Sequence, residues 1–345
     1  MDVSGIDAAS VTRWIAERAD VTPPLRFDVI QGGRSNLTYT VTDADGRRLI
    51  LRRPPLHSVL ESAHDMGREH RLMSALEPTA VPVPHCVGYE PDDTVNGAPF
   101  YVMEHVDGAV VRSSGEAREV LSPAVRAAAS DDLVDVLVRL HDVDVDAVGL
   151  GDLSRKEGYV ERQLRRWRGQ LEQGGTRELP LLAEVHDRLA ADVPAQQGAS
   201  TVVHGDYRLD NVIVDPADGA VRAVLDWEIA TLGDPLADVG VLLVYWTEAG
   251  DTIFPLEDPP TVVEGFRSRS EVIERYAAGS GRDLTEIDFY TAFGYWKLAC
   301  ILEGVYTRYR SGAYGDASEE ETRRFGEIVP QLAEVAHEVA KEAGR

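Results

Sequence analysis

The segment of the sequence best suited to chemistry surrounds a short predicted hairpin. HGDYRLDN occupies 204–211, and LDWE follows at 225–228, after a short apolar run and a turn. Residues at the open ends of a hairpin lie close together, and carboxylate and amide oxygens are the groups that hold hard cations such as Mg²⁺. The spacing therefore indicates phosphoryl transfer, in which Asp206 accepts the proton of a substrate hydroxyl while Asn211 and Asp226 hold the metal.

Two other assignments of these side chains stay open. His204, Asp206 and Asp226 could together bind the metal of a hydrolase, although no second histidine cluster supports such a site. Arg208, two residues after the presumed base, could act as a catalytic residue by neutralising the transferring phosphoryl group. It could instead pair with Asp210 or Asp226 as a structural bridge.

The segment resembles the catalytic loop of the aminoglycoside and macrolide phosphotransferase family, small-molecule kinases in which H-G-D-x-x-x-x-N replaces the protein-kinase H-R-D form. GDPLAD at 233–238 resembles the family's D-P-x-x-D motif, in which Asp234 and Asp238 would brace the loop from a helix N-terminus. With LRRPP at 51–55, these motifs are most similar to the kinase-like domains also found fused to acyl-CoA dehydrogenases. The resemblance implies ATP as phosphoryl donor, Mg²⁺ as metal and a small-molecule hydroxyl as acceptor.

A glycine-containing loop between two strand-like runs is the candidate phosphate loop. It holds Gly33, Ser35 and Asn36, and small residues there let backbone N–H groups approach phosphate oxygens. A hairpin turn that binds no ligand would explain the glycines equally well.

The next strand carries the candidate phosphate cation. LILR at 49–52 matches the V-A-I-K pattern of kinases, with Arg52 in the lysine position and Glu69 as its expected partner. Because side chains alternate along a strand, Ile50 and Arg52 should share one face. Only three of the 35 basic residues are lysines and the first is Lys156, so arginine must serve here. Arginine can bind phosphate bidentately, but a surface arginine on an edge strand would show the same pattern.

The run FYVMEHVDG at 100–108 resembles the segment that connects the two lobes in this family. The resemblance implies that Met103 borders the adenine pocket and that Glu104 and Val106 offer main-chain hydrogen bonds. A core strand followed by a turn would also fit.

The elements that must position these residues fall into two parts. The first hundred residues alternate strand-like runs with two helices, and the remainder is mainly helical around a small group of strands. The sequence therefore predicts an α+β, protein-kinase-like two-lobed fold, with an antiparallel β-sheet N-lobe (1–108) and a mainly helical C-lobe (109–345). A candidate linker covers 108–118. Strands are expected over 26–31, 37–42, 47–53, 85–89, 99–105, 201–203, 212–214 and 221–226, and helices over 7–19, 62–76, 123–141, 157–172, 179–192, 235–247, 264–279, 284–310 and 318–342.

Composition limits the partners that this chain can have. It holds 59 Asp and Glu against 35 Lys and Arg, a formal net charge of −24, which opposes binding to nucleic acid or to anionic membranes. Two distant cysteines exclude a disulfide framework, and the N-terminus lacks the pattern of a signal peptide. We expect a cytoplasmic monomer or homodimer that binds neither nucleic acid nor membrane.

Three functions fit these motifs. The first is an ATP-dependent small-molecule kinase, and the intact Asp206, Asn211 and Asp226 favour it. The second is a nucleotide-binding pseudokinase or regulatory module, which the arginine at position 52 allows. The third is nucleotidyl transfer, which would need a reversed triphosphate. The acceptor stays open among antibiotics, hydroxy acids, acyl-CoAs and other metabolites, with Tyr245 and Trp246 as candidate contacts.

Overall fold

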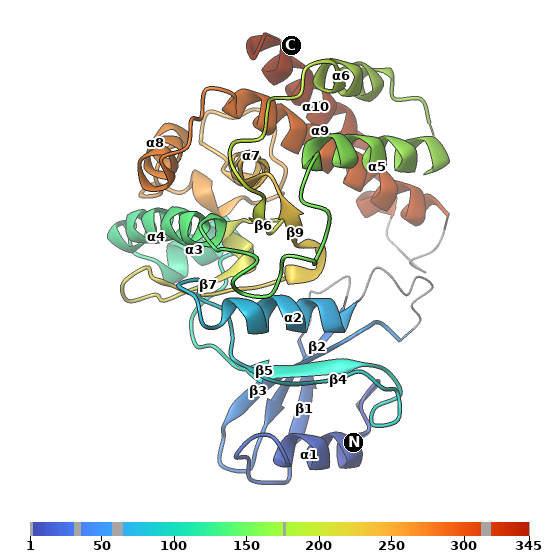
Figure 1. The fold of residues 1–345 in the computed structure, drawn as a ribbon, viewed down its shortest axis with the longest axis vertical. Helices are drawn as coiled ribbons and strands as arrows, with labels where there is room; N and C mark the ends of the chain where they lie inside the picture. The colour runs from blue at the N-terminus through green and yellow to red at the C-terminus, as the bar shows by residue number, and fades with distance from the viewer. Residues whose placement is uncertain (1–2, 31–35, 57–64, 175–176, 312–318, 345) are drawn as a thin grey trace.

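The structure is a computed structural model that describes residues 3–30, 36–56, 65–174, 177–311 and 319–344. A five-stranded sheet forms the N-terminal part, and helices dominate the C-terminal part (Figure 1). The sheet is antiparallel, with strands in the order β1-β2-β3-β5-β4. The elements of the N-terminal part are α1 (Ala8–Ala16), β1 (Arg26–Val29), β2 (Leu37–Thr42), β3 (Arg48–Arg53), α2 (Met66–Leu76), β4 (Cys86–Glu90) and β5 (Phe100–Glu104).

The alternation of side chains on β3 decides what the sheet presents to each side. Leu49 and Leu51 pack in the core beneath α1, whereas Ile50 belongs to the larger core on the α2 side and lines a cleft with Arg52. The predicted shared face of Ile50 and Arg52 is therefore confirmed. Arg53 points the other way and is buried, donating to the carbonyl of Gly5.

Helix α2 lies between the sheet and the helical part (Figure 1). Asp65 caps its N-terminus by accepting from the Arg68 amide. Two arginines then tether it across the molecule, because Arg68 donates to the carbonyl of Ala230 at 2.7 Å and Arg71 donates to that of Gly149 at 2.7 Å. The helix is thus held from both parts of the chain.

The C-terminal part largely follows the predicted order, with three corrections. The helix predicted over 264–279 begins only at Arg269, because Ser268 caps it. The candidate linker at 108–118 contains the start of a helix, α3, which begins after Ser113 because that side chain accepts from the Glu116 amide. A strand that was not predicted, β9, pairs with β6, so the strands do not form one hairpin group. The division into lobes at residue 108 stays a prediction. The elements are α3 (Ser114–Val120), α4 (Pro123–His141), α5 (Tyr159–Gly174), α6 (Pro180–Ala191), β6 (Thr201–Val203), β7 (Val212–Val214), β8 (Val221–Val224), β9 (Thr231–Gly233), α7 (Pro235–Tyr245), α8 (Arg269–Ser280), α9 (Ile287–Arg310) and α10 (Glu319–Glu342).

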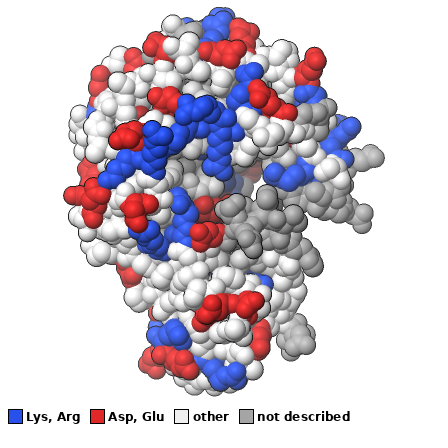
Figure 2. All heavy atoms as spheres, turned by 45° about the vertical axis from the view of Figure 1, so that its right-hand side comes forward, with Lys and Arg blue, Asp and Glu red and all other residues white. Residues whose placement is uncertain are grey.

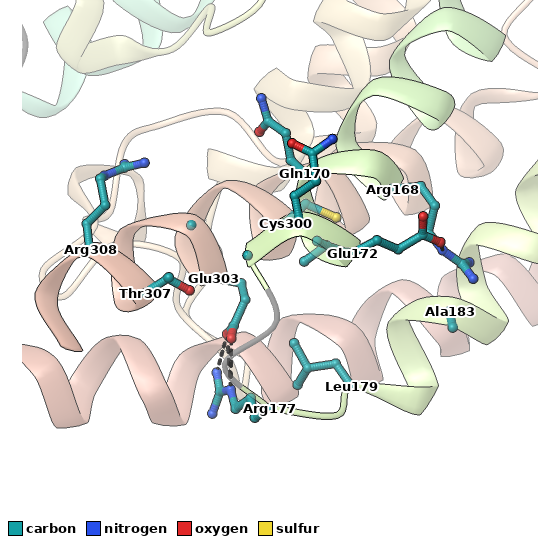
Figure 3. Close-up of a pocket in the computed structure, with 14 residues that line it drawn as sticks. Arg168, Gln170, Glu172, Arg177, Leu179, Ala183, Cys300, Glu303, Thr307 and Arg308 are labelled. Carbon is teal, nitrogen blue, oxygen red and sulfur yellow. Dashed lines mark hydrogen bonds and ion pairs between the residues drawn. The ribbon is translucent and has the colours of Figure 1, made fainter. Parts of the chain in front are cut away.

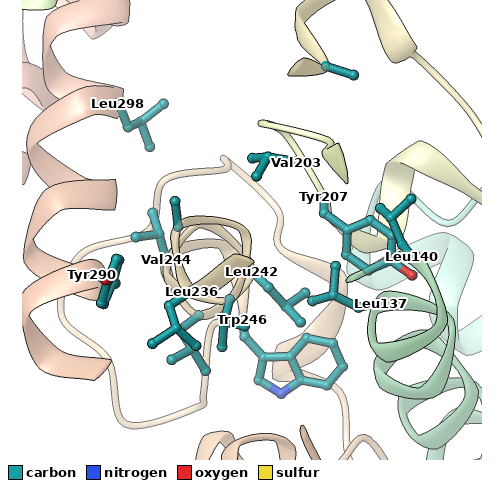
Figure 4. Packing of buried hydrophobic residues seen from close by; sticks show 14 of the residues in the cluster. Leu137, Leu140, Val203, Tyr207, Leu236, Leu242, Val244, Trp246, Tyr290 and Leu298 are labelled. Carbon is teal, nitrogen blue, oxygen red and sulfur yellow. The ribbon is translucent and has the colours of Figure 1, made fainter. Parts of the chain in front are cut away.

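Helix α7 is the centre of the C-terminal core. It is apolar on almost every side, and a helix of that kind must be covered all round. Figure 4 shows Leu242 and Trp246 near Leu137 of α4, while Val244 lies on the side of Leu298 in α9. Because α7 is fixed in this way, its first turn is a rigid support for whatever rests on it. Within the described part of the chain, no helix is long and apolar enough to cross a bilayer.

We expect replacement of Gly240 by alanine to loosen this core. Gly240 of α7 lies against the backbone of Tyr290 in α9, and an added Cβ would overlap the Tyr290 carbonyl. Overpacking of this kind destabilises by about 1–3 kcal/mol. Gly169→Ala is the matched control, because that helical position faces open space and alanine there should stabilise by about 0.5–1 kcal/mol. Urea unfolding of both variants checks this, and equal effects would contradict the close packing.

Candidate active site

The loop between β6 and β7 presents Asp206. Its carboxylate accepts from the side-chain amide of Asn211 at 3.0 Å and from Arg208 Nε at 3.2 Å. The side chain of Asp206 remains 27% exposed, so a substrate hydroxyl can reach it. The predicted base is therefore oriented by two donors and keeps an exposed face.

The β7–β8 hairpin brings together the two predicted metal ligands. Val212 pairs with Val224, and the amide of Leu225 donates to the carbonyl of Asn211 at 2.8 Å. Asn211 and Asp226 therefore flank one end of the hairpin. Because the Asn211 amide nitrogen faces Asp206, its amide oxygen is the atom available to a cation.

Asp226 has a strained backbone. Its φ is 63° and its ψ is 59°, and among the described residues no other non-glycine has a positive φ. The left-handed conformation costs a non-glycine residue about 1–2 kcal/mol. Strain of this size is typical of positions where a side chain must be aimed at a functional site. At Asp226 it turns the chain out of β8 with the carboxylate toward Arg52.

His204 and Asp238 brace the catalytic loop, as the sequence predicted for Asp238. The Asp238 carboxylate accepts from the amides of His204 at 2.6 Å and Gly205 at 2.7 Å. Burial alone would raise the pKa of Asp238, but hydrogen bonds from His141 and Gly205 bring it below its usual value. His204 Nε2 donates to the carbonyl of Leu225 at 2.8 Å, and its Nδ1 accepts from the Asp206 amide at 3.3 Å.

These bonds overturn the hydrolase assignment, because neither ring nitrogen of His204 is available to a metal. They also tie the loop of the presumed base to the loop of Asp226. The second predicted brace, Asp234, caps α7 and accepts from the Tyr290 hydroxyl at 2.7 Å.

Arg208 takes part in a structural network. Its Nη1 lies 2.8 Å from an Asp210 carboxylate oxygen, its Nε contacts Asp206, and its guanidinium lies 4.6 Å from the centre of the Tyr245 ring. The bridge to Asp210 is therefore present, whereas the described contacts include none to Asp226. A direct catalytic role for Arg208 stays a prediction.

Arg52 lies at the centre of an acidic group. Its Nη2 is 2.6 Å from Asp226 Oδ1, and its Nε is 3.5 Å from Glu69 Oε2, so the expected partner on α2 is present. The edge-strand alternative is wrong, because β3 is the central strand and the Arg52 side chain is only 13% exposed. Burial alone lowers the pKa of Arg52, but the negative groups around it, Glu69 and Asp226 among them, raise it above its usual value.

Glu69 is held by donors on both carboxylate oxygens. The side-chain amide of Asn36 donates to one at 2.9 Å, and the Tyr101 hydroxyl donates to the other at 2.9 Å. Burial nonetheless raises the pKa of Glu69 from its ordinary 4.5 to about 7, against the opposing effect of Arg52.

This shift predicts a pH effect on stability. Between pH 4.5 and about 7 the folded chain keeps a proton on Glu69 that the unfolded chain has released, so this group's contribution to stability falls as pH rises. We expect Glu69→Gln to flatten the dependence of Tm on pH across that window. Scanning calorimetry at several pH values measures it, and an unchanged slope in the variant would contradict the shifted pKa.

The phosphate-loop prediction is tested only at Asn36, because Gly33 and Ser35 lie outside the described residues. Asn36 is buried and bridges to the metal loop, donating to Glu228 at 3.3 Å as well as to Glu69. Its amide oxygen has no hydrogen-bond partner among the described residues. The sequence analysis did not include Glu228 among the site residues, although its position two residues after Asp226 could have indicated that it lies at the site.

A cavity of about 640 Å³ is lined by Asn36, Arg52 and Glu228 and by the two predicted metal ligands, whereas Asp206 and Glu69 are not among its lining residues. At its rim the Glu104 amide donates to the His85 carbonyl at 2.9 Å, and the Val106 amide has no partner among the described residues, so the predicted main-chain contact from Val106 to adenine is possible. Two buried polar atoms, Asn36 Oδ1 and Arg52 Nε, lack hydrogen bonds at this cavity. Its lining includes Ile50, Arg52, Met103, Glu104, Val106, Arg208, Asp210, Asn211, Asp226 and Glu228.

A second cavity, of about 430 Å³, lies among α5, α6 and α9 (Figure 3). Cys300, Glu303 and Arg308 line its α9 side, and Arg177 forms an ion pair with Glu303 at 2.6 Å. None of the predicted site residues lines it, so the chemistry indicated by the motifs belongs to the first cavity.

The sequence pattern of the phosphotransferase enzyme family matches residues 26–290, most of the chain. The chain belongs to this family. Acyl-CoA dehydrogenase family member 10 of Mus musculus is 34% identical over 326 residues, which cover 94% of this chain and 30% of the relative. Family member 11 of Homo sapiens is 32% identical over 317 residues, covering 90% and 39%. The chain therefore spans less than half the length of these curated relatives.

Solved structures agree with the fold. A protein of Ralstonia eutropha, provisionally named an aminoglycoside phosphotransferase, is 31% identical with a TM-score of 0.82, covering 98% of this chain and 99% of that chain. A macrolide 2'-phosphotransferase of Brachybacterium faecium shares the fold at 21% identity and a TM-score of 0.58, covering 92% and 97%. The predicted family and the α+β, protein-kinase-like fold are confirmed.

Proposed function

We propose that this phosphotransferase transfers the γ-phosphoryl group of ATP to the hydroxyl of a small molecule. The observation that carries the proposal is the convergence of Asp206, Asn211 and Asp226 beside the cavity that Arg52 lines. An acceptor oxygen forms a bond to the γ-phosphorus, the bond from that phosphorus to the bridging oxygen of ADP breaks, and the hydroxyl proton passes to the carboxylate of Asp206. ADP and a phosphomonoester are the products.

The side chains around the cavity fit ATP and Mg²⁺. Asn211 and Asp226 offer the oxygen ligands that Mg²⁺ takes from proteins, and Mg²⁺ usually completes its shell with phosphate and water. Arg52 lines the cavity, and its guanidinium group could bind a phosphate oxygen there. When bound, Mg²⁺ would neutralise charge on the phosphates.

The pseudokinase alternative has less support. A pseudokinase need not keep a base, yet Asp206 is oriented by two donors, and the Arg52–Glu69 contact follows the arrangement expected of an active kinase. We also infer that the enzyme acts in the cytoplasm as a monomer or homodimer, without nucleic acid or membrane partners.

Arginines in and just before helix α5 favour an acceptor with negative charge, and Arg166 lies near enough to the catalytic loop that it acts with Asp206 on the pKa of Lys297. Figure 2 shows a band of Lys and Arg side chains on the face where α5 lies, although the whole chain is strongly acidic. Among the described residues, Arg155, Arg162, Arg165 and Arg166 form no ion pair with a carboxylate, and Arg162 donates to the Arg155 carbonyl at 2.7 Å. Burial lowers the pKa of Arg162, and the charges of Arg155 and Arg165 lower it further, so these cations lie close together.

A surface of this kind repels a polycationic aminoglycoside and attracts carboxylates and phosphates. The relatives named acyl-CoA dehydrogenases point the same way, because acyl-CoAs are polyanions. We therefore propose anionic hydroxylated compounds, with hydroxyacyl-CoAs and hydroxy acids first, as the acceptor class.

A phosphate-transfer screen with γ-labelled ATP tests both statements. It should include hydroxyacyl-CoAs, hydroxy acids, macrolides and aminoglycosides. We expect anionic acceptors to be phosphorylated, with kcat/KM falling about tenfold or more in R165E/R166E and not in the control R222E. Transfer to cationic acceptors alone would overturn the acceptor class, whereas absence of both transfer and Mg²⁺-dependent ATP binding would overturn the proposed function.

A further inference from the structure

A buried lysine lies directly behind the loop that presents Asp206. Lys297 of α9 is 5% exposed, and its Nζ donates to the carbonyl of Gly205 at 3.0 Å. Gly205 precedes the presumed base, and its φ of +85° is one that glycine adopts readily. The peptide unit that leads into Asp206 is therefore bonded on its carbonyl side to a helix about 90 residues further along the chain.

The other side of the same loop is held by an opposite charge. The Asp238 carboxylate accepts from the amides of His204 and Gly205, so the loop lies between a buried carboxylate and a buried ammonium group. Buried charges are tolerated when they are compensated. Burial lowers the pKa of Lys297, and the charges of Asp238 and Asp206 oppose that shift, so the carboxylates partly compensate the ammonium group. His141, the other group on Asp238, is also fully buried, and burial lowers its pKa.

The composition of the chain adds a second argument. Of the 35 basic residues, 32 are arginines and three are lysines. Lys297 is buried, whereas the side chains of Lys156 and Lys341 are 37% and 49% exposed. The ammonium group is compact, while the guanidinium group is broad and planar. A buried position in contact with the Gly205 carbonyl favours the compact group.

Resting on the function proposed above, we propose that Lys297 is a positioning residue for phosphoryl transfer. Its ammonium group fixes the Gly205 carbonyl, and this holds the Asp206 carboxylate where it meets the acceptor hydroxyl. Lys297 does not line the cavity of about 640 Å³ that would hold ATP, so we expect it to affect kcat and not nucleotide binding.

The test compares Lys297→Met with Lys156→Met in the full chain. In Lys297→Met we expect kcat to fall about 100-fold, since misplacement of a catalytic group by about 1 Å has effects of that size. KM for ATP and the Kd for Mg²⁺-ATP from calorimetry should stay within about threefold, and Lys156→Met should match the wild type. A parallel rise in KM, or a wild-type kcat in Lys297→Met, would overturn the inference.

Two further measurements keep the outcome clear. Hydrogen exchange of the peptide spanning 203–208 should be about tenfold faster in Lys297→Met, and this readout does not need an acceptor. Unchanged exchange would refute the positioning contact while leaving the proposed function standing. A wild-type chain without transferase activity would refute the function instead.

If Lys297→Met does not fold, Lys297→Arg is the second variant, because it keeps the charge. We expect Lys297→Arg to lose about tenfold in kcat. Full activity of Lys297→Arg would overturn the requirement for a compact ammonium group.

Discussion

Replacing Asp206 with asparagine should abolish most phosphoryl transfer while leaving nucleotide binding intact. A positioned general base contributes about 10²–10⁴-fold to a rate, so we expect kcat to fall by about 10³-fold. The Kd for Mg²⁺-ATP should change little, because the predicted metal ligands are Asn211 and Asp226. Single-turnover transfer and calorimetry on the same preparation measure the two quantities.

Asp210→Asn is the matched control for this experiment. Asp210 lies on the same loop and also pairs with Arg208, at 2.8 Å, but its described contacts do not include Asn211. We expect it to lower kcat less than tenfold, through a loosened Arg208. If Asp206→Asn retained more than a tenth of the wild-type kcat, Asp206 could not be the base. If it lost ATP binding as well, its role would lie in the metal site.

Replacing Asp226 with alanine should remove the Mg²⁺ dependence of ATP binding. The carboxylate is the one charged ligand among the two predicted metal ligands, and the loss of an interaction with a charged group weakens binding roughly 10- to 100-fold. Arg52 would also lose its partner at 2.6 Å. Calorimetric titrations with Mg²⁺-ATP and with ATP in a chelator should then give equal affinities.

The same hairpin provides the control for Asp226. Asp215 lies at its other end and pairs with the exposed Arg222 at 2.6 Å. Asp215→Ala should therefore bind Mg²⁺-ATP like the wild type. Retained Mg²⁺ dependence in Asp226→Ala would mean that the metal is held elsewhere.

The sequence alone determined the features that depend on short spacing. The period of two along β3 was enough to place Ile50 and Arg52 on one face, because alternation follows from the pleat of any strand. The approach of Asn211 to Asp226 could also be predicted, because the two residues are joined by two short strands and one turn. The helices were predicted well where an apolar stripe marked them. Helix α3 was not predicted, although Ser113 caps it, because its seven residues are too few to show such a stripe.

Only the tertiary structure decided contacts between distant segments. Arg52 and Asp226 are 174 positions apart, and Asn36 and Glu228 are 192 apart. No local pattern encodes such a pair, because it depends on how the sheet, α2 and the metal loop pack together. The burial of Arg52 on a central strand, the strain at Asp226 and the pairing of Arg208 with Asp210 also emerged only there. Lys297 is the clearest case: in the sequence it is one of three lysines, and the packing of α9 against the catalytic loop gives it a role.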